Sequence, residues 1–242
     1  MTGSSRNLGA TIARTLAQQG ACVAVTFDSS RSEAEELVDS MPGGSHIALA
    51  FEAKSADSVV SLVQAAHDGL GGLDVLVNNV GPWAGEDIRT IPISDWRRVW
   101  DGNLTAAWVA SIAALGYMEE SGWGRIVNIS AGSAFMRNHS AYGLAKHAMI
   151  ALTEEMALAA AQGVTVNCIA PGQIAESIAE LGSELGEDGA ELVQRVLHRT
   201  PTGRMVTRQE VADVVALVCT ETFGSMTGTT IPLDGGWRLN RE

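Results

Sequence analysis

The chain is poor in basic residues, cysteine and aromatic residues, and it has no long apolar run. Its 16 Lys and Arg residues are outnumbered by 28 Asp and Glu residues, which gives a formal net charge of −12 at pH 7. Nucleic acids and anionic membranes bind clustered Lys and Arg, so neither is an expected partner. No apolar run reaches the ~18 residues of a membrane span, and the first residues are polar. These absences favour a cytoplasmic protein.

Cysteine and histidine are too few and too scattered for a structural framework. The three cysteines, Cys22, Cys168 and Cys219, lie far apart in apolar stretches. An odd number at such spacing argues against disulfides and predicts buried, reduced thiols. The five histidines show no ligand spacing, so we predict no metal site.

What is present is the composition of one globular domain. The chain has 242 residues, of which 46% are hydrophobic and 18% are charged. These values are typical of a folded chain rather than a disordered one. No internal repeat or linker-like stretch divides the sequence, so residues 1–242 are expected to form a single domain.

Short apolar runs alternate with longer stretches of helical periodicity. The strand-like runs are Cys22–Phe27, His46–Phe51, Val75–Asn78, Arg125–Ile129, Val164–Ile169 and Thr230–Leu233. The helical stretches are Gly9–Gln19, Ser32–Ser40, Ala56–Gly69, Ser94–Glu120, Ala141–Ala161 and Arg208–Cys219. This alternation predicts an α/β fold with a doubly wound parallel sheet and helices on both faces. Residues 174–200 have weak periodicity and many Gly, Ser and Glu residues, which predicts a long loop that serves as a substrate lid.

A turn rich in glycine and serine precedes the first predicted helix. Small residues let the backbone turn tightly, and the N–H groups at the helix start can bind a pyrophosphate. The residues of this turn that we assign to a bound nucleotide are Gly3, Ser5, Arg6, Asn7, Leu8 and Gly9. Such turns are common, so the rest of the chain decides what this one means.

Further motifs follow in a fixed order. They are Asn78-Asn79-Val80-Gly81, Asn103, serines after the strand that ends at Ile129, Tyr142-x3-Lys146, Pro171-Gly172 and Leu233-Asp234-Gly235-Gly236. From Thr2 to about Trp237 the chain resembles the short-chain dehydrogenase/reductase family, in its 3-oxoacyl-reductase-like group. The resemblance implies a Rossmann-type fold, a nicotinamide cofactor, and hydride transfer between that cofactor and a ketone or secondary alcohol.

Tyr142 and Lys146 lie one helical turn apart, so they project from one face of a helix. A nearby ammonium favours the phenolate and is expected to bring the pKa of Tyr142 from ~10 toward neutrality. The resemblance implies that Tyr142 exchanges a proton with the carbonyl oxygen. It also implies that Lys146 binds the nicotinamide ribose and that Asn103 holds a water in a proton relay.

The catalytic serine of the family has no direct counterpart at the expected spacing. Thirteen residues before the tyrosine this chain has Ile129. Ser133 and Ser130 are the candidates, and the alternation of side chains along extended backbone favours Ser133 slightly. If neither reaches Tyr142, the carbonyl oxygen loses a hydrogen-bond donor, a loss of roughly 2.7–4 kcal/mol at comparable sites.

The resemblance assigns further residues to the cofactor. These are Ser29, Arg31, Glu52, Ala53, Asn79, Gly81, Pro171, Gly172 and Ile174, together with Tyr142 and Lys146. Members that prefer NAD end the second strand with an acid, but this chain has Phe27 there. Arg6 and Arg31 can surround a 2′-phosphate, which predicts NADP(H). Asp28, one residue beyond the usual acidic position, leaves NAD(H) as the alternative.

The substrate is expected to be a small ketone or secondary alcohol. Reductases of fatty-acid synthesis bind an acidic carrier protein through basic residues, where this chain has Glu119, Glu120 and Gln162. Like charges oppose such docking. A carrier-protein-dependent 3-oxoacyl reductase is the alternative, and a second is a catalytically impaired homologue that binds nucleotides as a sensor or subunit. The resemblance also implies a homotetramer or a homodimer.

The start of the chain is short for the family. The glycine loop begins at Thr2, whereas the family has a strand of about five to six residues before it, central in the sheet. A parallel sheet without that strand leaves unpaired backbone groups on both neighbours. We therefore expect the natural chain to begin before Met1.

Overall fold

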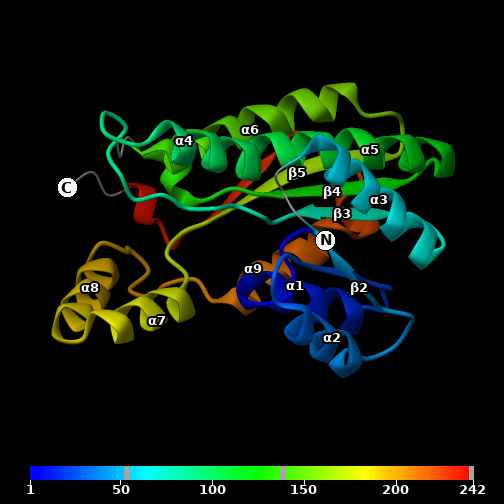
Figure 1. The fold of residues 1–242 in the computed structure, drawn as a ribbon. Coiled ribbons are helices and arrows are strands. Elements are labelled where there is room, and N and C mark those ends of the chain that lie inside the picture. The colour runs from blue at the N-terminus through cyan, green and yellow to red at the C-terminus, as the bar shows by residue number, and fades with distance from the viewer. Residues whose placement is uncertain (52–54, 137–139, 240–242) are drawn as a thin grey trace.

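The strands are short and all of them pair in parallel (Figure 1). The computed structural model describes residues 1–51, 55–136 and 140–239. Within these residues the strands are β1 (Ala24–Phe27), β2 (Ile47–Ala50), β3 (Val75–Asn78), β4 (Gly124–Ile129), β5 (Val164–Pro171) and β6 (Thr230–Leu233). Every strand-like run of the sequence therefore forms a strand.

Helices connect the strands and cover both faces of the sheet (Figure 1). They are α1 (Asn7–Gln18), α2 (Arg31–Ser40), α3 (Ala56–Leu70), α4 (Ile93–Trp100), α5 (Ala106–Ser121), α6 (Ala141–Ala159), α7 (Ala175–Leu185), α8 (Glu187–His198) and α9 (Arg208–Val218). The predicted doubly wound Rossmann-type sheet is confirmed. None of the described helices is long and apolar enough to cross a membrane.

Alternation along β4 shows how one strand serves two layers. Val127 and Ile129 belong to the apolar cluster formed with α1, α2 and α9, whereas Ile126 belongs to the cluster formed with α3, α5 and α6. Successive side chains of a strand point to opposite faces, so a nearly continuous apolar run fills both layers.

The strands form two hydrogen-bonded groups, β1-β2 and β3-β4-β5-β6. Residues 1–4 lie between them. The Met1 amino group donates to the Ala24 carbonyl oxygen at 3.1 Å, and the Thr2 amide donates to the Val77 carbonyl oxygen at 3.0 Å. The Ser4 amide donates to the Thr26 carbonyl oxygen at 3.2 Å. Through these hydrogen bonds, residues 1–4 join β1 to β3 at the place where the sequence predicts a central strand.

Two sequence predictions need correction. Residues 174–200 are not an irregular loop but the helical pair α7 and α8, set apart from the two layers (Figure 1). The stretch Ser94–Glu120 is not one regular helix, because a π-helical turn over Asp101–Thr105 separates α4 from α5. Such turns are rare and occur frequently at functional sites.

Candidate active site

The glycine loop has the backbone geometry that its sequence predicts. Gly3 has φ +61°, and Asn7, at the start of α1, is the only described non-glycine residue with positive φ, at +52°. A Cβ on Gly9 would overlap the Gly3 carbonyl oxygen and lie 2.8 Å from the Ser4 Cα. The loop can fold this tightly against α1 only with glycine at position 9. It leaves the unpaired N–H groups of the first turn of α1 next to a cavity of about 690 Å³ lined by Arg6, Asn7, Leu8 and Gly9.

Asn79 holds the loop against the end of β3. Its Nδ2 donates to the Gly3 carbonyl oxygen at 2.8 Å, while its backbone amide donates to the Thr2 hydroxyl at 3.0 Å. Asn79 also lines the 690 Å³ cavity. The residue predicted to bind cofactor thus shapes the loop as well.

Asn103, Lys146 and Gly81 converge at one point. A Cβ built on Gly81 would lie 2.6 Å from Asn103 Oδ1 and 2.8 Å from Lys146 Nζ. Only a glycine leaves room for both polar groups. Residues from the π-helical turn, from α6 and from the end of β3 therefore meet, as the resemblance implies.

The π-helical turn aims Asn103 inward. Asn103 is fully buried, and its Nδ2 donates to the carbonyl oxygens of Pro82 at 2.8 Å and Val99 at 2.9 Å. Its Oδ1 is buried and has no hydrogen-bond partner in the described part of the chain. A buried unpaired acceptor costs free energy, so its persistence points to a ligand or a water at this place.

Tyr142 and Lys146 lie on one face of α6, which begins with a cap in which Ser140 Oγ accepts from the Gly143 amide at 2.9 Å. Lys146 Nζ lies 5.6 Å from the centre of the Tyr142 ring and donates to the Ile129 carbonyl oxygen at 2.7 Å. Burial lowers the pKa of Lys146 to about 8. The carbonyl at the end of β4 thus orients the ammonium group.

The expected direction of the Tyr142 pKa shift is wrong in this structure. Burial raises the pKa of Tyr142 to about 12, because removing the phenolate from water is costly. Tyr142 is therefore a protonated phenol at neutral pH and is suited to donate a proton.

The two candidate serines have different surroundings. Ser130 is buried, and its hydroxyl donates to the Lys146 carbonyl oxygen at 2.7 Å, so it fastens α6 to β4. Ser133 lies in a short 3₁₀ turn, lines the same cavity as Tyr142, and its buried Oγ has no partner in the described residues. The geometry favours Ser133 as the donor to a bound carbonyl.

The cavity that contains Tyr142 has a volume of about 810 Å³ and lies at the carboxyl ends of the strands of the larger group. Such edges are where open α/β sheets bind ligands. We call it the catalytic cavity. Its lining residues are Asn7, Gly81, Trp83, Ala84, Gly85, Ala131, Gly132, Ser133, Ser140, Tyr142, Pro171, Gly172, Gln173, Ile174, Ser177, Ile178 and Trp237.

Pro171, Gly172 and Ile174 line the catalytic cavity, as the resemblance implies. A Cβ on Gly172 would lie 2.7 Å from the Asp234 Cα, so glycine lets the segments after β5 and β6 approach closely. Glu176 turns away from the cavity, and its carboxylate accepts from the Arg208 amide at the start of α9.

The predicted 2′-phosphate residues are only partly brought together. Arg6 and Ser29 line one small cavity of about 200 Å³, together with Asp28. Arg31 is outside its lining: the side chain pairs with Glu35 at 3.3 Å and lies over the Phe27 ring at 5.2 Å. Glu52 and Ala53 lie outside the described residues.

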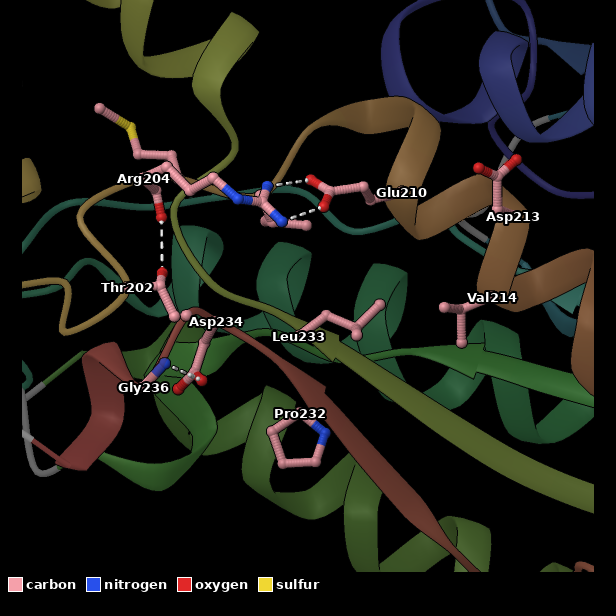
Figure 2. A pocket seen from close by; sticks show the side chains of 12 residues that line it. Thr202, Arg204, Glu210, Asp213, Val214, Pro232, Leu233, Asp234 and Gly236 are labelled. Atoms are coloured by element: carbon pink, nitrogen blue, oxygen red, sulfur yellow. Dashed lines mark hydrogen bonds and ion pairs between the residues drawn. The ribbon is translucent and has the colours of Figure 1, made fainter.

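A separate cavity of about 520 Å³ lies between α9 and β6 (Figure 2). Arg204, the one cation among its lining residues, makes two hydrogen-bonded contacts with the Glu210 carboxylate, at 2.7 and 2.9 Å. Asp213 and Asp234 add negative charge. Because the arginine is already paired, this cavity does not offer a free cation to a phosphate.

Sequence reasoning missed Trp83, Gly85, Gln173 and Trp237 as lining residues of the catalytic cavity. The sequence could have indicated the two tryptophans, because each comes within two residues of a motif that ends at the carboxyl edge of the sheet. Trp83 comes two residues after Gly81, and Trp237 comes directly after Gly236.

Comparisons with known proteins agree with this site. A family model described as "Enoyl-(Acyl carrier protein) reductase" matches residues 3–238. A D-beta-hydroxybutyrate dehydrogenase of Rhizobium meliloti is 30% identical, covering 98% of this chain and 96% of its own. A 3-oxoacyl-(acyl-carrier-protein) reductase of Haemophilus influenzae is also 30% identical, covering 99% and 97%.

Solved structures show the same fold. A double mutant of a Serratia marcescens short-chain dehydrogenase/reductase has a TM-score of 0.86 at 30% identity, covering 98% of this chain and 95% of that one. A putative short-chain alcohol dehydrogenase from Sinorhizobium meliloti has a TM-score of 0.88 at 28% identity, covering 98% and 94%.

The chain therefore belongs to the short-chain dehydrogenase/reductase family and is an oxidoreductase that uses a nicotinamide cofactor. Within that family its relatives place it in the 3-oxoacyl-reductase-like group.

Proposed function

We propose that the protein is an NADP(H)-dependent oxidoreductase that moves hydride between nicotinamide and a small ketone or secondary alcohol, with Tyr142 as the general acid or base. One observation carries the proposal. Tyr142 and Ser133 line one cavity, and Lys146 and Asn103 converge directly behind Gly81.

The residues present fit a dinucleotide. The glycine loop leaves the N–H groups of α1 free for a pyrophosphate, Gly9 admits no side chain, and Asn103 Oδ1 lacks a partner among the described residues. The residues that would hold the cofactor are Gly3, Ser5, Arg6, Asn7, Leu8, Gly9, Asn79, Gly81, Pro171, Gly172 and Ile174. When bound, the nicotinamide supplies or accepts the hydride.

The chain's own residues handle the proton. In reduction, Tyr142 donates its phenolic proton to the carbonyl oxygen as hydride reaches the carbonyl carbon, and the product is a secondary alcohol. Ser133 Oγ donates a second hydrogen bond to the same oxygen. Asn103 Oδ1 holds a water that returns a proton toward Tyr142, and Lys146 binds the ribose hydroxyls.

The protonation state of Tyr142 favours reduction near neutral pH. With its pKa raised to about 12 by burial, the phenol carries the proton that reduction consumes. Alcohol oxidation needs the phenolate as base, so it is expected to accelerate as the pH rises.

NADP(H) is favoured by the chemistry around the 200 Å³ cavity. Arg6 brings a cation to it, and Ser5, Ser29 and Ser30 bring hydroxyls that can donate to a phosphate. Asp28 opposes this assignment. Tighter binding of NADPH than NADH, lost in Arg6→Ala, is expected in fluorescence titrations; equal or tighter NADH binding would refute the assignment.

A free ketone suits the surface better than a carrier-bound substrate. Glu119 and Glu120 lie exposed at the end of α5, where an acidic carrier would meet like charge. The test is the loss of NADPH absorbance with a panel of ketones and with acyl-carrier thioesters. Turnover of carrier-bound substrate far above that of free ketones would favour the 3-oxoacyl reductase instead.

Replacement of Tyr142 by Phe tests the mechanism itself. NADPH binding is expected to persist while ketone turnover disappears, because the ring remains and only the proton donor is lost. Turnover at the wild-type rate in Tyr142→Phe would disprove the assigned role.

We also propose that α7 and α8 act as the substrate lid, since Ile174, Ser177 and Ile178 from this segment line the catalytic cavity.

A homotetramer or homodimer is proposed through α5 and α6, where Trp108 and Ile112 are each about half exposed. The three thiols are free, in keeping with a reducing cytoplasm, but only Cys168 is buried: Cys219 is partly exposed and Cys22 is exposed, so the prediction that all three are buried is wrong. Light scattering of the purified protein measures the assembly.

A further inference from the structure

Two tryptophans, Trp83 and Trp237, line the catalytic cavity. The order of the larger strand group is β3-β4-β5-β6, and Trp83 follows β3 while Trp237 follows β6. Ser133 and Tyr142 line the same cavity as the two tryptophans, and the Trp237 ring lies close to Gly132, the residue before Ser133. The cavity has a volume of about 810 Å³, a space that one or two fused rings can share with the nicotinamide.

Trp83 is held in place although it is exposed. Its side chain lies against Gly85, where a Cβ would overlap the benzene edge of the indole. Arg98, which also pairs with Asp95 at 3.0 Å, donates to the Trp83 carbonyl oxygen at 3.2 Å and fixes the backbone. The side chain is 67% exposed, so much of an indole remains available for contact.

The Trp237 ring is held by contacts with neighbouring residues. The Arg199 guanidinium carbon lies 5.7 Å from the centre of its ring, within the range of a cation–π contact. A Cβ on Gly132 would lie at an ordinary contact distance of 3.7 Å from the ring, so the indole packs next to the backbone after β4. A ring that is packed in this way loses little freedom when a ligand stacks on it.

The described lining of the catalytic cavity carries no Asp, Glu, Lys or Arg. Ala84, Ala131, Ile174 and Ile178 add apolar wall, and Gln173 is the larger of the two amide side chains there. A carboxylate placed in this lining would lose its water without gaining a counter-charge, which is unfavourable. An uncharged molecule meets no such penalty.

We propose that the substrate is an uncharged ketone that carries one or two aromatic rings, stacked by Trp83 and Trp237 with its carbonyl at Tyr142 and Ser133. This inference rests on the proposed ketone reduction and narrows it. It separates the protein from a relative that acts on an anionic hydroxy acid, because the described lining offers no charge to such a substrate.

Three matched carbonyl compounds test the inference with NADPH. They are 1-phenyl-1,2-propanedione, 2,3-butanedione, which lacks the ring, and benzoylformate, which keeps the ring but adds a carboxylate. We expect kcat/KM for the phenyl diketone to exceed that for each of the others by tenfold or more. An equal or higher value for butanedione or benzoylformate overturns the inference while leaving ketone reduction intact.

Variants of Trp83 test whether its indole produces the preference for the phenyl diketone. Trp83→Ala is expected to raise KM for the phenyl diketone on the order of tenfold, since an aromatic contact and its buried area are lost, with kcat nearly unchanged. The KM for butanedione should change less than twofold, and Trp83→Phe should restore most of the loss. Gly85→Ala, which keeps the indole but displaces it, should resemble Trp83→Ala.

Val60→Ala is the control, because Val60 is about half exposed on α3, outside the proposed subunit interface, and does not line the cavity. The control should keep the preference for the phenyl diketone. Unchanged KM values in folded Trp83→Ala refute the stacking. Absence of turnover with all three compounds, despite NADPH binding, overturns the proposed function and with it the inference.

Discussion

A single methyl group at Gly81 should disable the site without unfolding the protein. The Cβ of Gly81→Ala would lie 2.6 Å from Asn103 Oδ1 and 2.8 Å from Lys146 Nζ, whereas comfortable non-bonded contacts begin near about 3.5 Å. Each polar atom would have to retreat by somewhat less than ~1 Å. Neither is free to do so, since Lys146 Nζ is bound to the Ile129 carbonyl and the Asn103 amide is bound to two carbonyl oxygens.

The expected magnitude follows from those displacements. Misplacing a catalytic group by ~1 Å costs about 100-fold in rate, so we expect kcat of Gly81→Ala to fall by about that factor. Overpacking typically costs about 1–3 kcal/mol, a loss of a few degrees to ~10 °C in Tm for a chain of this size. The variant should therefore remain folded at 25 °C.

Gly116→Ala is the matched control. Gly116 lies exposed within α5, and a Cβ there meets no atom within 4 Å. Alanine should stabilise the helix by about 0.4–1 kcal/mol and leave kcat unchanged. Steady-state ketone reduction, thermal melting and NADPH titration are the measurements. Wild-type kcat in folded Gly81→Ala would refute the convergence of the two side chains at this residue.

Three further predictions follow from the same structure. Ser133→Ala should lower kcat by about 10²–10³ while Ser130→Ala should mainly lower Tm, and the reverse pattern in activity and melting would exchange their roles. Because burial lowers the pKa of Lys146 to about 8, kcat/KM for NADPH should fall as the pH rises through about 8; a limb near 10 in the pH profile would contradict this. Glu210 completes a capping box with Thr207. Hydrogen bonds from Arg204 and then from the Thr207 amide lower its pKa to about 2, so its stabilisation is present above its ordinary pKa and is lost as the pH falls from ~4.5 to ~2. Glu210→Gln should cost about 1 kcal/mol at pH 7 in urea unfolding, discounted for exposure, and the difference should vanish near pH 2.

The strands were predictable because short apolar runs leave few choices. Val75–Asn78 and Arg125–Ile129 are nearly continuous apolar segments bounded by turns, and both become buried parallel strands. The alignment of Tyr142 with Lys146 was predictable for a similar reason, since a spacing of four residues on a helix fixes a common face.

The helices α7 and α8 were not predictable from periodicity. Their segment contains several glycines, and two of them, Gly182 and Gly189, face each other so closely that a Cβ on Gly189 would overlap the Gly182 carbonyl. Arg208 fastens α7 through Glu180 at 2.7 Å. Tertiary contacts between distant residues stabilise these helices, and a local pattern does not contain them.

The state of Tyr142 and the choice between the serines depend on burial in three dimensions. The sequence shows the neighbouring ammonium but not how much water is removed from the phenol, so the direction of the pKa shift was wrong. The alternation of side chains along extended backbone favoured Ser133 only slightly. The hydrogen bond from Ser130 to the Lys146 carbonyl oxygen shows that the Ser130 hydroxyl is already engaged, which leaves Ser133 as the candidate donor.

The few residues that join the two strand groups are also the first residues of the glycine loop. Thr2 hydrogen-bonds to β3 and Ser4 hydrogen-bonds to β1. Gly3 between them lines the cavity of about 690 Å³ next to α1. A nucleotide bound there would contact residues that hydrogen-bond to both strand groups, so nucleotide binding is expected to stabilise the junction between them. By mass action, a ligand at 100 times its Kd adds about 2.7 kcal/mol to the stability of the whole chain. In a cell rich in nicotinamide nucleotides, the bound cofactor then stabilises the junction between the two strand groups, whether or not a substrate is present.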